Sequence, residues 1–320
     1  MNTAGRLGLY GAGLVVVFGV AFAAAGALVP DSAVASWTER GAAGHEEKSA
    51  EEAAQNAGPG EEEGTDVSGV TIAASGYILG AVSAPGEPGL AGDLSFEIRD
   101  AAGEPVTAYE TAHGKQLHLI VVRNDGSRYR HVHPELDAKT GTWSLPWTWD
   151  AAGTYRVYAD FTAEGGSGTT LSRTVDVAGA FAPEPPVGTQ TRTTVDGFDV
   201  TIRGALVAGT GSELTVEVTR DGEPVTTLEP YLGAFGHLVA LREGDLAYLH
   251  VHAHGEEPET GDLAGPEVVF TAQAPTAGRY LLYLDFQVDG KVHTAPFVLD
   301  ATASAEHAST DSGDDDHGGH

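Results

Sequence analysis

The feature that most constrains the fold of this chain is an internal duplication. Residues 117–134 read LHLIVVRNDGSRYRHVHP, and residues 236–253 read GHLVALREGDLAYLHVHA. In each stretch one histidine is followed by a hydrophobic run, a turn and a His-Val-His sequence, and equivalent histidines lie 119 positions apart. An arginine and a tyrosine keep the same offset (Arg123 and Arg242, Tyr129 and Tyr248). A constant offset of this kind indicates two modules with one fold.

The sequence between the breaks is typical of strands. Short runs rich in Val, Ile, Leu, Phe and Tyr, such as LSFEIRD, GTYRVYADF and ELTVEVTRDG, alternate with turn residues. No helical period persists beyond the N-terminal apolar segment. This pattern predicts an all-β protein of two tandem Ig-like or cupredoxin-like antiparallel β-sandwiches, over residues 67–179 and 193–300. The Pro-rich residues 180–192 are expected to link them.

A second set of matching residues extends the duplication. Gly153, Tyr155, Tyr158, Asp160 and Phe161 correspond at an offset of 125 to Gly278, Tyr280, Tyr283, Asp285 and Phe286. The extra residues of the second copy therefore lie after its His-Val-His, within AHGEEPETGDLAGPE, which predicts an exposed loop. The repeated aspartates are expected to end strands or to support ligands.

Composition excludes several classes of function. The 320 residues, 41% hydrophobic, are enough for two domains that each bury a core. A formal net charge of −29 repels phosphate backbones and attracts cations, so nucleic acid is excluded as a partner. The chain has no cysteine and its one methionine is Met1, so disulfides, thiolate chemistry and a dedicated copper(I) site are not expected.

The N-terminus predicts export. Residues 7–29 carry no charge and are long enough to cross a bilayer as a helix. Arg6 precedes this segment, so residues 1–6 are expected in the cytoplasm and the bulk of a single-pass cell-membrane protein outside. The alternative is a cleaved signal peptide, for which Ala33-Val34-Ala35 fits a cleavage site. Residues 30–66 and 301–320 are expected to be a disordered acidic tether and a disordered acidic, histidine-containing tail.

The repeated histidines are the candidate site residues. Side chains alternate along a strand, so His131 and His133 share a face with Tyr129, and the turn in RNDGSRY would bring His118 alongside them. Three neutral imidazoles with an open position suit copper(II) or zinc. The predicted metal ligands are His118, His131 and His133 in the first module and His237, His250 and His252 in the second, with His254 as a possible addition.

Other roles for these histidines stay open. A histidine in an apolar run, such as His118 or His237, is often a packed residue with bonded nitrogens, and a His-x-His pair can shield a strand edge. Packing alone would tolerate Tyr, Gln or Thr at such positions, so the conserved spacing between the copies favours metal binding. No Glu or Asp follows either triad at a spacing that identifies a general base, and we therefore expect no enzyme.

The stretch HLIVV…HVHP…AGTYRVYADF resembles a β-sandwich module of exported bacterial proteins associated with heavy-metal or copper handling. In outline it is similar to the YtkA-like and CopC-like sandwiches. The resemblance covers residues 67–178 and, more loosely, 193–300, where the motif ends HVHA instead of HVHP. AGTYRVYA also resembles the strand that carries the cysteine ligand of cupredoxins, but Ala159 and Leu284 occupy the position of that cysteine. The resemblance implies a sandwich fold and a metal context without electron transfer.

The sequence therefore predicts a membrane-anchored extracytoplasmic protein that sequesters or presents copper(II) or zinc through one three-histidine site in each module. Its expected partners are metal ions, the membrane through the N-terminal helix, and a metal transporter or another surface protein. The alternative is a structural or interaction protein with tandem Ig-like domains and packed histidines.

Overall fold

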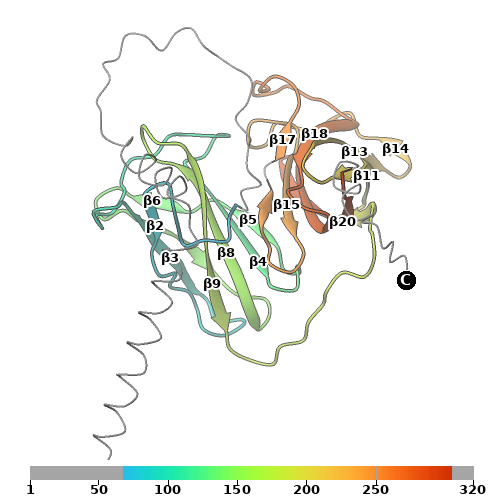
Figure 1. Cartoon of the computed structure of the whole chain (residues 1–320). Coiled ribbons are helices and arrows are strands. Elements are labelled where there is room, and N and C mark those ends of the chain that lie inside the picture. The colour runs from blue at the N-terminus through green and yellow to red at the C-terminus, as the bar shows by residue number, and fades with distance from the viewer. Residues whose placement is uncertain (1–67, 250, 305–320) are drawn as a thin grey trace, which may run out of the picture. The chain divides into compact units, whose positions relative to one another are not determined.

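The computed structural model describes residues 68–249 and 251–304 (Figure 1). Over these residues the regular elements are strands, which confirms the all-β class. None of them forms a helix with the length and apolarity needed to cross a bilayer. The predicted anchor at 7–29, the tether and residues 305–320 of the tail lie outside the described residues.

The first module contains two sheets. One has the strand order β1-β2-β3-β7-β6, and the other has the order β5-β4-β8-β9. Their strands are β1 (Ala73–Ala74), β2 (Tyr77–Leu79), β3 (Gly92–Arg99), β4 (Leu117–Arg123), β5 (Arg130–Val132), β6 (Glu135–Asp137), β7 (Thr142–Trp147), β8 (Gly153–Thr162) and β9 (Gly168–Val177).

The second module repeats this plan. One sheet has the order β10-β11-β13-β18-β17 with β14 beside β13, and the other has the order β12-β20-β19-β15-β16. Their strands are β10 (Arg192–Val195), β11 (Phe198–Gly204), β12 (Leu206–Val207), β13 (Gly211–Arg220), β14 (Glu223–Pro224), β15 (His237–Arg242), β16 (Tyr248–Leu249), β17 (Val251–Ala253), β18 (Glu267–Gln273), β19 (Gly278–Val288) and β20 (Lys291–Thr302). Because β20 runs to Thr302, this sandwich extends past the predicted end at residue 300.

The strand pairs are antiparallel except for β12 and β20, which pair in parallel. The duplication is visible in the backbone as well as in the sequence. Gly153 begins β8 with a φ of 135° and Gly278 begins β19 with a φ of 139°, a conformation that L side chains rarely adopt. A Cβ on Gly153 would also lie 3.0 Å from Arg123 Cδ and from the Phe181 ring.

Each module has its own core, formed by alternate residues of its strands. In β3 the inward side chains are Leu94, Phe96 and Ile98, and they pack with aromatic residues that include Trp143. In β13 the inward side chains Leu214 and Val216 pack in the core of the second module. Two-residue periodicity of this kind is what a sheet with one buried face requires.

The central strand of the first module is buried on both faces. Every residue of β4 is buried. Leu117, Leu119 and Val121 belong to the core of the first module, whereas Ile120 and Val122 belong to a third cluster.

This intermodule cluster includes side chains from both modules: Ile120, Val122, Tyr158, Val239, Leu241, Leu246, Leu281, Tyr283 and Val298. The outer faces of the β4–β8 and β15–β19 pairs therefore pack together.

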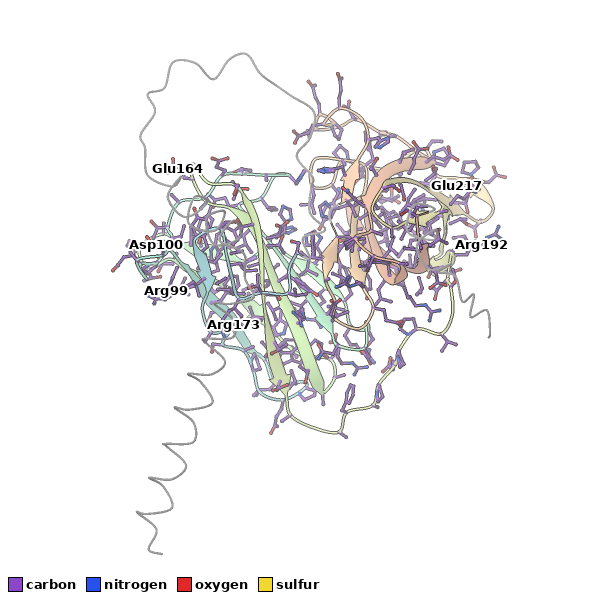
Figure 2. All side chains as sticks on the ribbon, viewed as in Figure 1. Arg99, Asp100, Glu164, Arg173, Arg192 and Glu217 are labelled. Carbon is purple, nitrogen blue, oxygen red and sulfur yellow. The ribbon has the colours of Figure 1, made fainter. Side chains whose placement is uncertain are left out.

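Charged side chains such as Arg99, Glu164 and Arg192 are exposed on the surface (Figure 2). Arg99 pairs with Glu97, and Arg203 pairs with Glu217, both between partly exposed side chains. Pairs of this kind contribute little to stability. The apolar clusters are therefore the main source of fold stability.

Candidate metal centre

The first histidine group is built by the β4–β5 hairpin. Leu119 pairs with Val132 and Ile120 with His131, so this register places His133, which follows β5, beside His118. Val132 packs against the core of the first module, and Tyr129 packs on the opposite side against the intermodule cluster. The predicted antiparallel hairpin and the shared face of Tyr129 and His131 are confirmed.

The three imidazoles converge on one point. Nδ1 of His118 lies 3.1 Å from Nε2 of His131 and 3.2 Å from Nε2 of His133. One nitrogen from each ring lies within 4.8 Å of the other two, and no other group of this kind occurs among residues 68–249 and 251–304. Ligand nitrogens of a tetrahedral site with metal–nitrogen bonds of about 2.0 Å are about 3.3 Å apart. The spacing therefore fits a metal ion.

The remaining nitrogens of two rings have acceptors. Nε2 of His118 lies 3.2 Å from the carbonyl oxygen of Ala112, which can only accept a hydrogen bond. Nδ1 of His131 lies 2.9 Å from Oδ2 of Asp285, a side chain on β19 that is 2% exposed. With Asp285 ionised, both outer nitrogens carry the hydrogen. The converging nitrogens of neutral His118 and His131 then carry lone pairs.

Burial keeps these histidines neutral. It lowers the pKa of His131 and of His133 to about 3, with a further contribution from the neighbouring histidines. Burial also lowers the pKa of His118, although the Ala112 carbonyl opposes this shift. For Asp285, burial raises the pKa to about 7 despite the hydrogen bond from Thr294. Imidazoles must be neutral to bind a metal, so the group is competent to do so near neutral pH.

His237 belongs to the second sequence motif, yet its ring lies against the first group. Its centroid is 4.9 Å from that of His131, and it stacks on His118 at 5.7 Å with the planes 3° apart. Burial lowers its pKa well below the usual value, with His131 the next cause.

The remaining predicted ligands are placed differently. His252 is exposed on β17, and Nε2 of exposed His254 lies 2.6 Å from Thr271 Oγ1. His250 lies outside the described residues, so the second triad stays a prediction.

One residue at the site, His113, was not predicted as part of it, and another, Asp285, was expected to end a strand or to support a ligand. His113 lies 6.2 Å from His118 and 6.0 Å from His237, centroid to centroid. Its equivalent in the second copy is Leu232, so the duplication gave no signal for it. The repeat of Asp160 and Asp285 in the sequence indicated a role for Asp285, but it did not identify His131, 154 positions away, as the partner.

The chain belongs to a family described as a domain of unknown function, DUF8832. The family matches residues 73–179 and 193–303, which are the two modules and more than half of the chain. No significant match was found among curated proteins. The family description carries no function, so the resemblance to copper-handling sandwiches stays a prediction.

Several solved structures also match. Invasin, a bacterial integrin-binding protein, is 14% identical with a TM-score of 0.22, over 71% of this chain and 39% of invasin. A two-domain fibronectin type III segment of chicken tenascin is 13% identical with a TM-score of 0.21, over 69% and 96% of the two chains. The Yersinia pseudotuberculosis adhesin InvE is 13% identical with a TM-score of 0.20, over 67% and 55%. This chain thus spans under two thirds of the invasin and of the adhesin. Because these scores are low, the fold class rests on the strand pairing described above.

Proposed function

We propose that this protein binds a divalent metal ion, copper(II) or zinc, through His118, His131 and His133, and that it sequesters or presents the ion without catalysing a reaction. The observation that carries the proposal is the convergence of His118 Nδ1 with Nε2 of His131 and of His133, at 3.1 and 3.2 Å.

The chemistry of this convergence favours a cation. When Asp285 is ionised, the acceptors Ala112 and Asp285 hold the hydrogens on the far sides of the two rings, so that two lone pairs face each other at 3.1 Å and repel. A cation between the nitrogens turns this repulsion into ligation. Imidazole ligands without sulfur suit copper(II) and zinc.

The cellular setting of the proposal comes from the sequence. The uncharged residues 7–29 and the net charge of −29 support an anchored extracytoplasmic protein whose surface attracts cations. A metal transporter or another surface protein is the proposed exchange partner.

A structural role is the second candidate. The apolar intermodule cluster and the hydrogen-bonded tyrosines at its edge support an interaction protein in which the histidines complete the packing. Under this role the chain binds no whole-number equivalent of metal ion.

Calorimetric titration of the chelator-treated full chain with zinc or copper(II) tests the proposal. The wild type should bind at least one equivalent, and His118→Gln should lose one. His293→Gln is the matched control, since His293 is a buried histidine that contacts Asp196 outside the group. Equal binding by wild type and His118→Gln would favour the structural role.

The number of ions is a separate question. Two independent triads predict two equivalents, of which a His131→Gln, His133→Gln double variant should lose one. A variant without residues 304–320 should keep the ions bound at the histidine sites and lose any ions bound more loosely by the acidic tail.

A further inference from the structure

The spacing of four imidazole rings raises the question of which module supplies the last ligand. The centroids of His118, His131 and His133 are 5.0 to 5.3 Å apart. His237 lies 4.9 Å from His131 and 5.7 Å from His118, which is nearly the same spacing. Four imidazoles around one tetrahedral ion have centroids about 5 Å apart.

We propose that the ion of the three-histidine group is bound between the two modules, with His237 of the second module as its fourth ligand. This inference rests on the proposed metal function and assigns His237 to the first group. The metal site then joins the modules instead of belonging to one of them.

The strand register explains why His237 reaches the group. His237 begins β15 and pairs with Asp285 of β19, and Asp285 bonds to His131. His237 and Asp285, which lie side by side on β15 and β19, therefore both face the first group. His237 presents an imidazole, and Asp285 is the acceptor that orients His131. His118 and His131 each have a hydrogen-bond acceptor on their outer nitrogen, whereas His237 contributes ring contacts.

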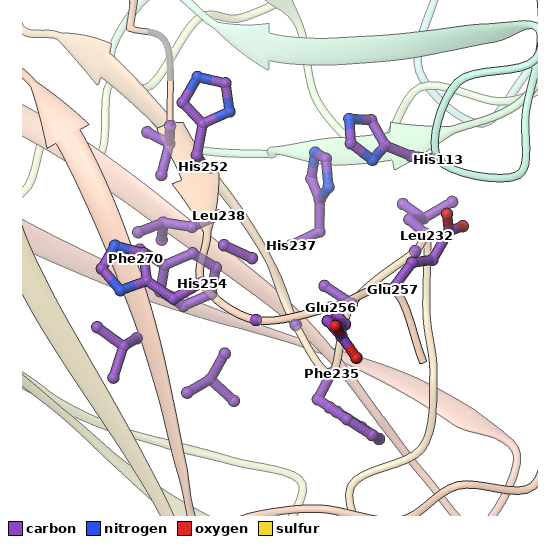
Figure 3. A pocket seen from close by; sticks show the side chains of 18 of the residues that line it. His113, Leu232, Phe235, His237, Leu238, His252, His254, Glu256, Glu257 and Phe270 are labelled. Atoms are coloured by element: carbon purple, nitrogen blue, oxygen red, sulfur yellow. The ribbon is translucent and has the colours of Figure 1, made fainter. Parts of the chain in front are cut away.

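Ligation requires the ring of His237 to change position. His237 is not among the residues whose ligand atoms lie within 4.8 Å of one another, so its ring must turn towards the group. The ring of His237 lines a cavity of about 470 Å³ (Figure 3). The side chains that line the cavity include His113, His252, His254, Glu256 and Glu257.

The cavity also provides a route for the ion. Glu256 and Glu257 belong to the loop that is longer in the second module than in the first. Acidic side chains at the mouth of a cavity raise the local concentration of cations. The loop that distinguishes the second module therefore lies where an ion would approach His237.

The test compares His118→Gln, His237→Gln, His237→Phe and, as a control outside the group, His293→Gln in the full chain. His237→Phe keeps a planar ring on His118 and so preserves the stack if Gln disturbs folding. Titration with copper(II) should show binding weakened about tenfold or more in both His237 variants, and unchanged binding in His293→Gln. The nitrogen hyperfine pattern in the copper(II) electron paramagnetic resonance spectrum should lose one imidazole, which a packing defect would not cause.

The outcomes separate the two proposals. If His118→Gln loses the ion while both His237 variants keep wild-type affinity and spectrum, the intermodule ligand is refuted and the metal function stands. If His118→Gln also binds as the wild type does, both proposals fail.

Discussion

Tyr158 and Tyr283 make the same hydrogen bond in opposite directions between the modules. Oη of Tyr158 donates to the Leu246 carbonyl and Oη of Tyr283 donates to the Gly126 carbonyl, each at 2.5 Å. The two tyrosines are equivalent in the duplication, and their acceptors lie in equivalent turns. The modules therefore contact each other as the two halves of a symmetric dimer do, with one surface used twice.

The Tyr283→Phe variant tests this contact. Tyr283→Phe leaves the partly buried Gly126 carbonyl without its donor, which should lower the free energy of unfolding by about 1–2 kcal/mol. Tyr158→Phe should have a similar effect. Urea unfolding followed by circular dichroism measures both. If neither variant shifts the midpoint, the packing between the modules is not maintained in solution.

Gly126 gives a second test of the same contact. Its φ is 80°, and an added Cβ would lie 2.4 Å from Cδ1 of Leu281 in the other module. Gly103 has a φ of 86° with nothing within 4 Å of such a Cβ, so Gly103→Ala reports backbone strain alone. Gly126→Ala should destabilise the chain by about 1–3 kcal/mol more than Gly103→Ala, because the buried leucine must move. Equal melting temperatures for the two variants would contradict the contact.

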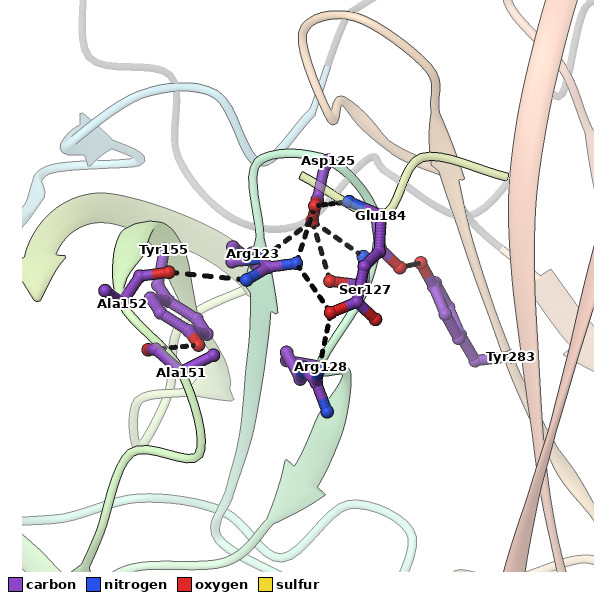
Figure 4. Close-up of polar contacts among 10 residues, drawn as sticks. Arg123, Asp125, Ser127, Arg128, Ala151, Ala152, Tyr155, Glu184 and Tyr283 are labelled. Carbon is purple, nitrogen blue, oxygen red and sulfur yellow. Dashed lines mark hydrogen bonds and ion pairs between the residues drawn. The ribbon is translucent and has the colours of Figure 1, made fainter. Parts of the chain in front are cut away.

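A buried ion pair stabilises the turn that carries Gly126 (Figure 4). Arg123 binds Asp125 through Nε and Nη2 at 3.0 and 2.8 Å, and the two side chains are 1% and 6% exposed. Asp125→Ala leaves the buried guanidinium with only the half-exposed Glu184, at 3.6 Å, as an ion partner and should cost about 3 kcal/mol.

The second module holds the matched control for this pair. Arg242 pairs with Asp245, but these side chains are 19% and 45% exposed. Asp245→Ala should cost no more than about 1 kcal/mol. Chemical denaturation of both variants checks the difference, and similar losses would show that burial is not what gives the first pair its importance.

The strands and the hairpin were predictable from the sequence, whereas the packing of the modules was not. Alternating residues in β3 and β13 show which face is buried. The unbroken apolar run of β4 was the available signal for burial on both faces, but such a run does not identify the element that covers its second face. That element lies in the other module.

The part of the candidate site that lies on one hairpin was predictable from the sequence, whereas the part that comes from the other module was not. His118, His131 and His133 lie on one hairpin, so strand geometry alone brings them together. His237 and Asp285 reach the group only through contacts between modules, and the sequence favoured placing His237 in a separate triad. The spacing of histidines along one hairpin therefore predicts the ligands on that hairpin but not the residues that the other module contributes.

The buried histidines predict how the stability of the metal-free chain depends on pH. The pKa of His131 and of His133 is about 3 when folded, and the pKa values of His118 and His237 are also lowered. Unfolded histidine has a pKa of about 6.5, so below that pH the unfolded state binds more protons and folding stability falls.

Asp285 acts in the opposite direction. Its folded pKa of about 7 exceeds the unfolded value of about 3.9, so its contribution to stability is present at low pH and is lost as pH rises through 7. The four buried histidines bind more protons on unfolding than the single Asp285 carboxyl group releases. The net stability should therefore fall as pH drops from about 6.5 towards 4, by about 1.4 kcal/mol per pH unit for each extra proton bound by the unfolded state.

The Asp285→Asn variant separates these two effects. Asparagine keeps the size of the side chain and an acceptor for His131 but cannot titrate, so the loss of stability on acidification should become steeper than in the wild type. The variant lacks the opposing contribution that the wild type loses between about pH 4 and 7. Thermal melts of chelator-treated wild type and variant, recorded from pH 4 to 8.5, compare the two slopes. Since exposed histidines titrate alike in both states, a melting temperature that does not change between pH 6.5 and 4 would show that the four imidazoles are not buried in solution.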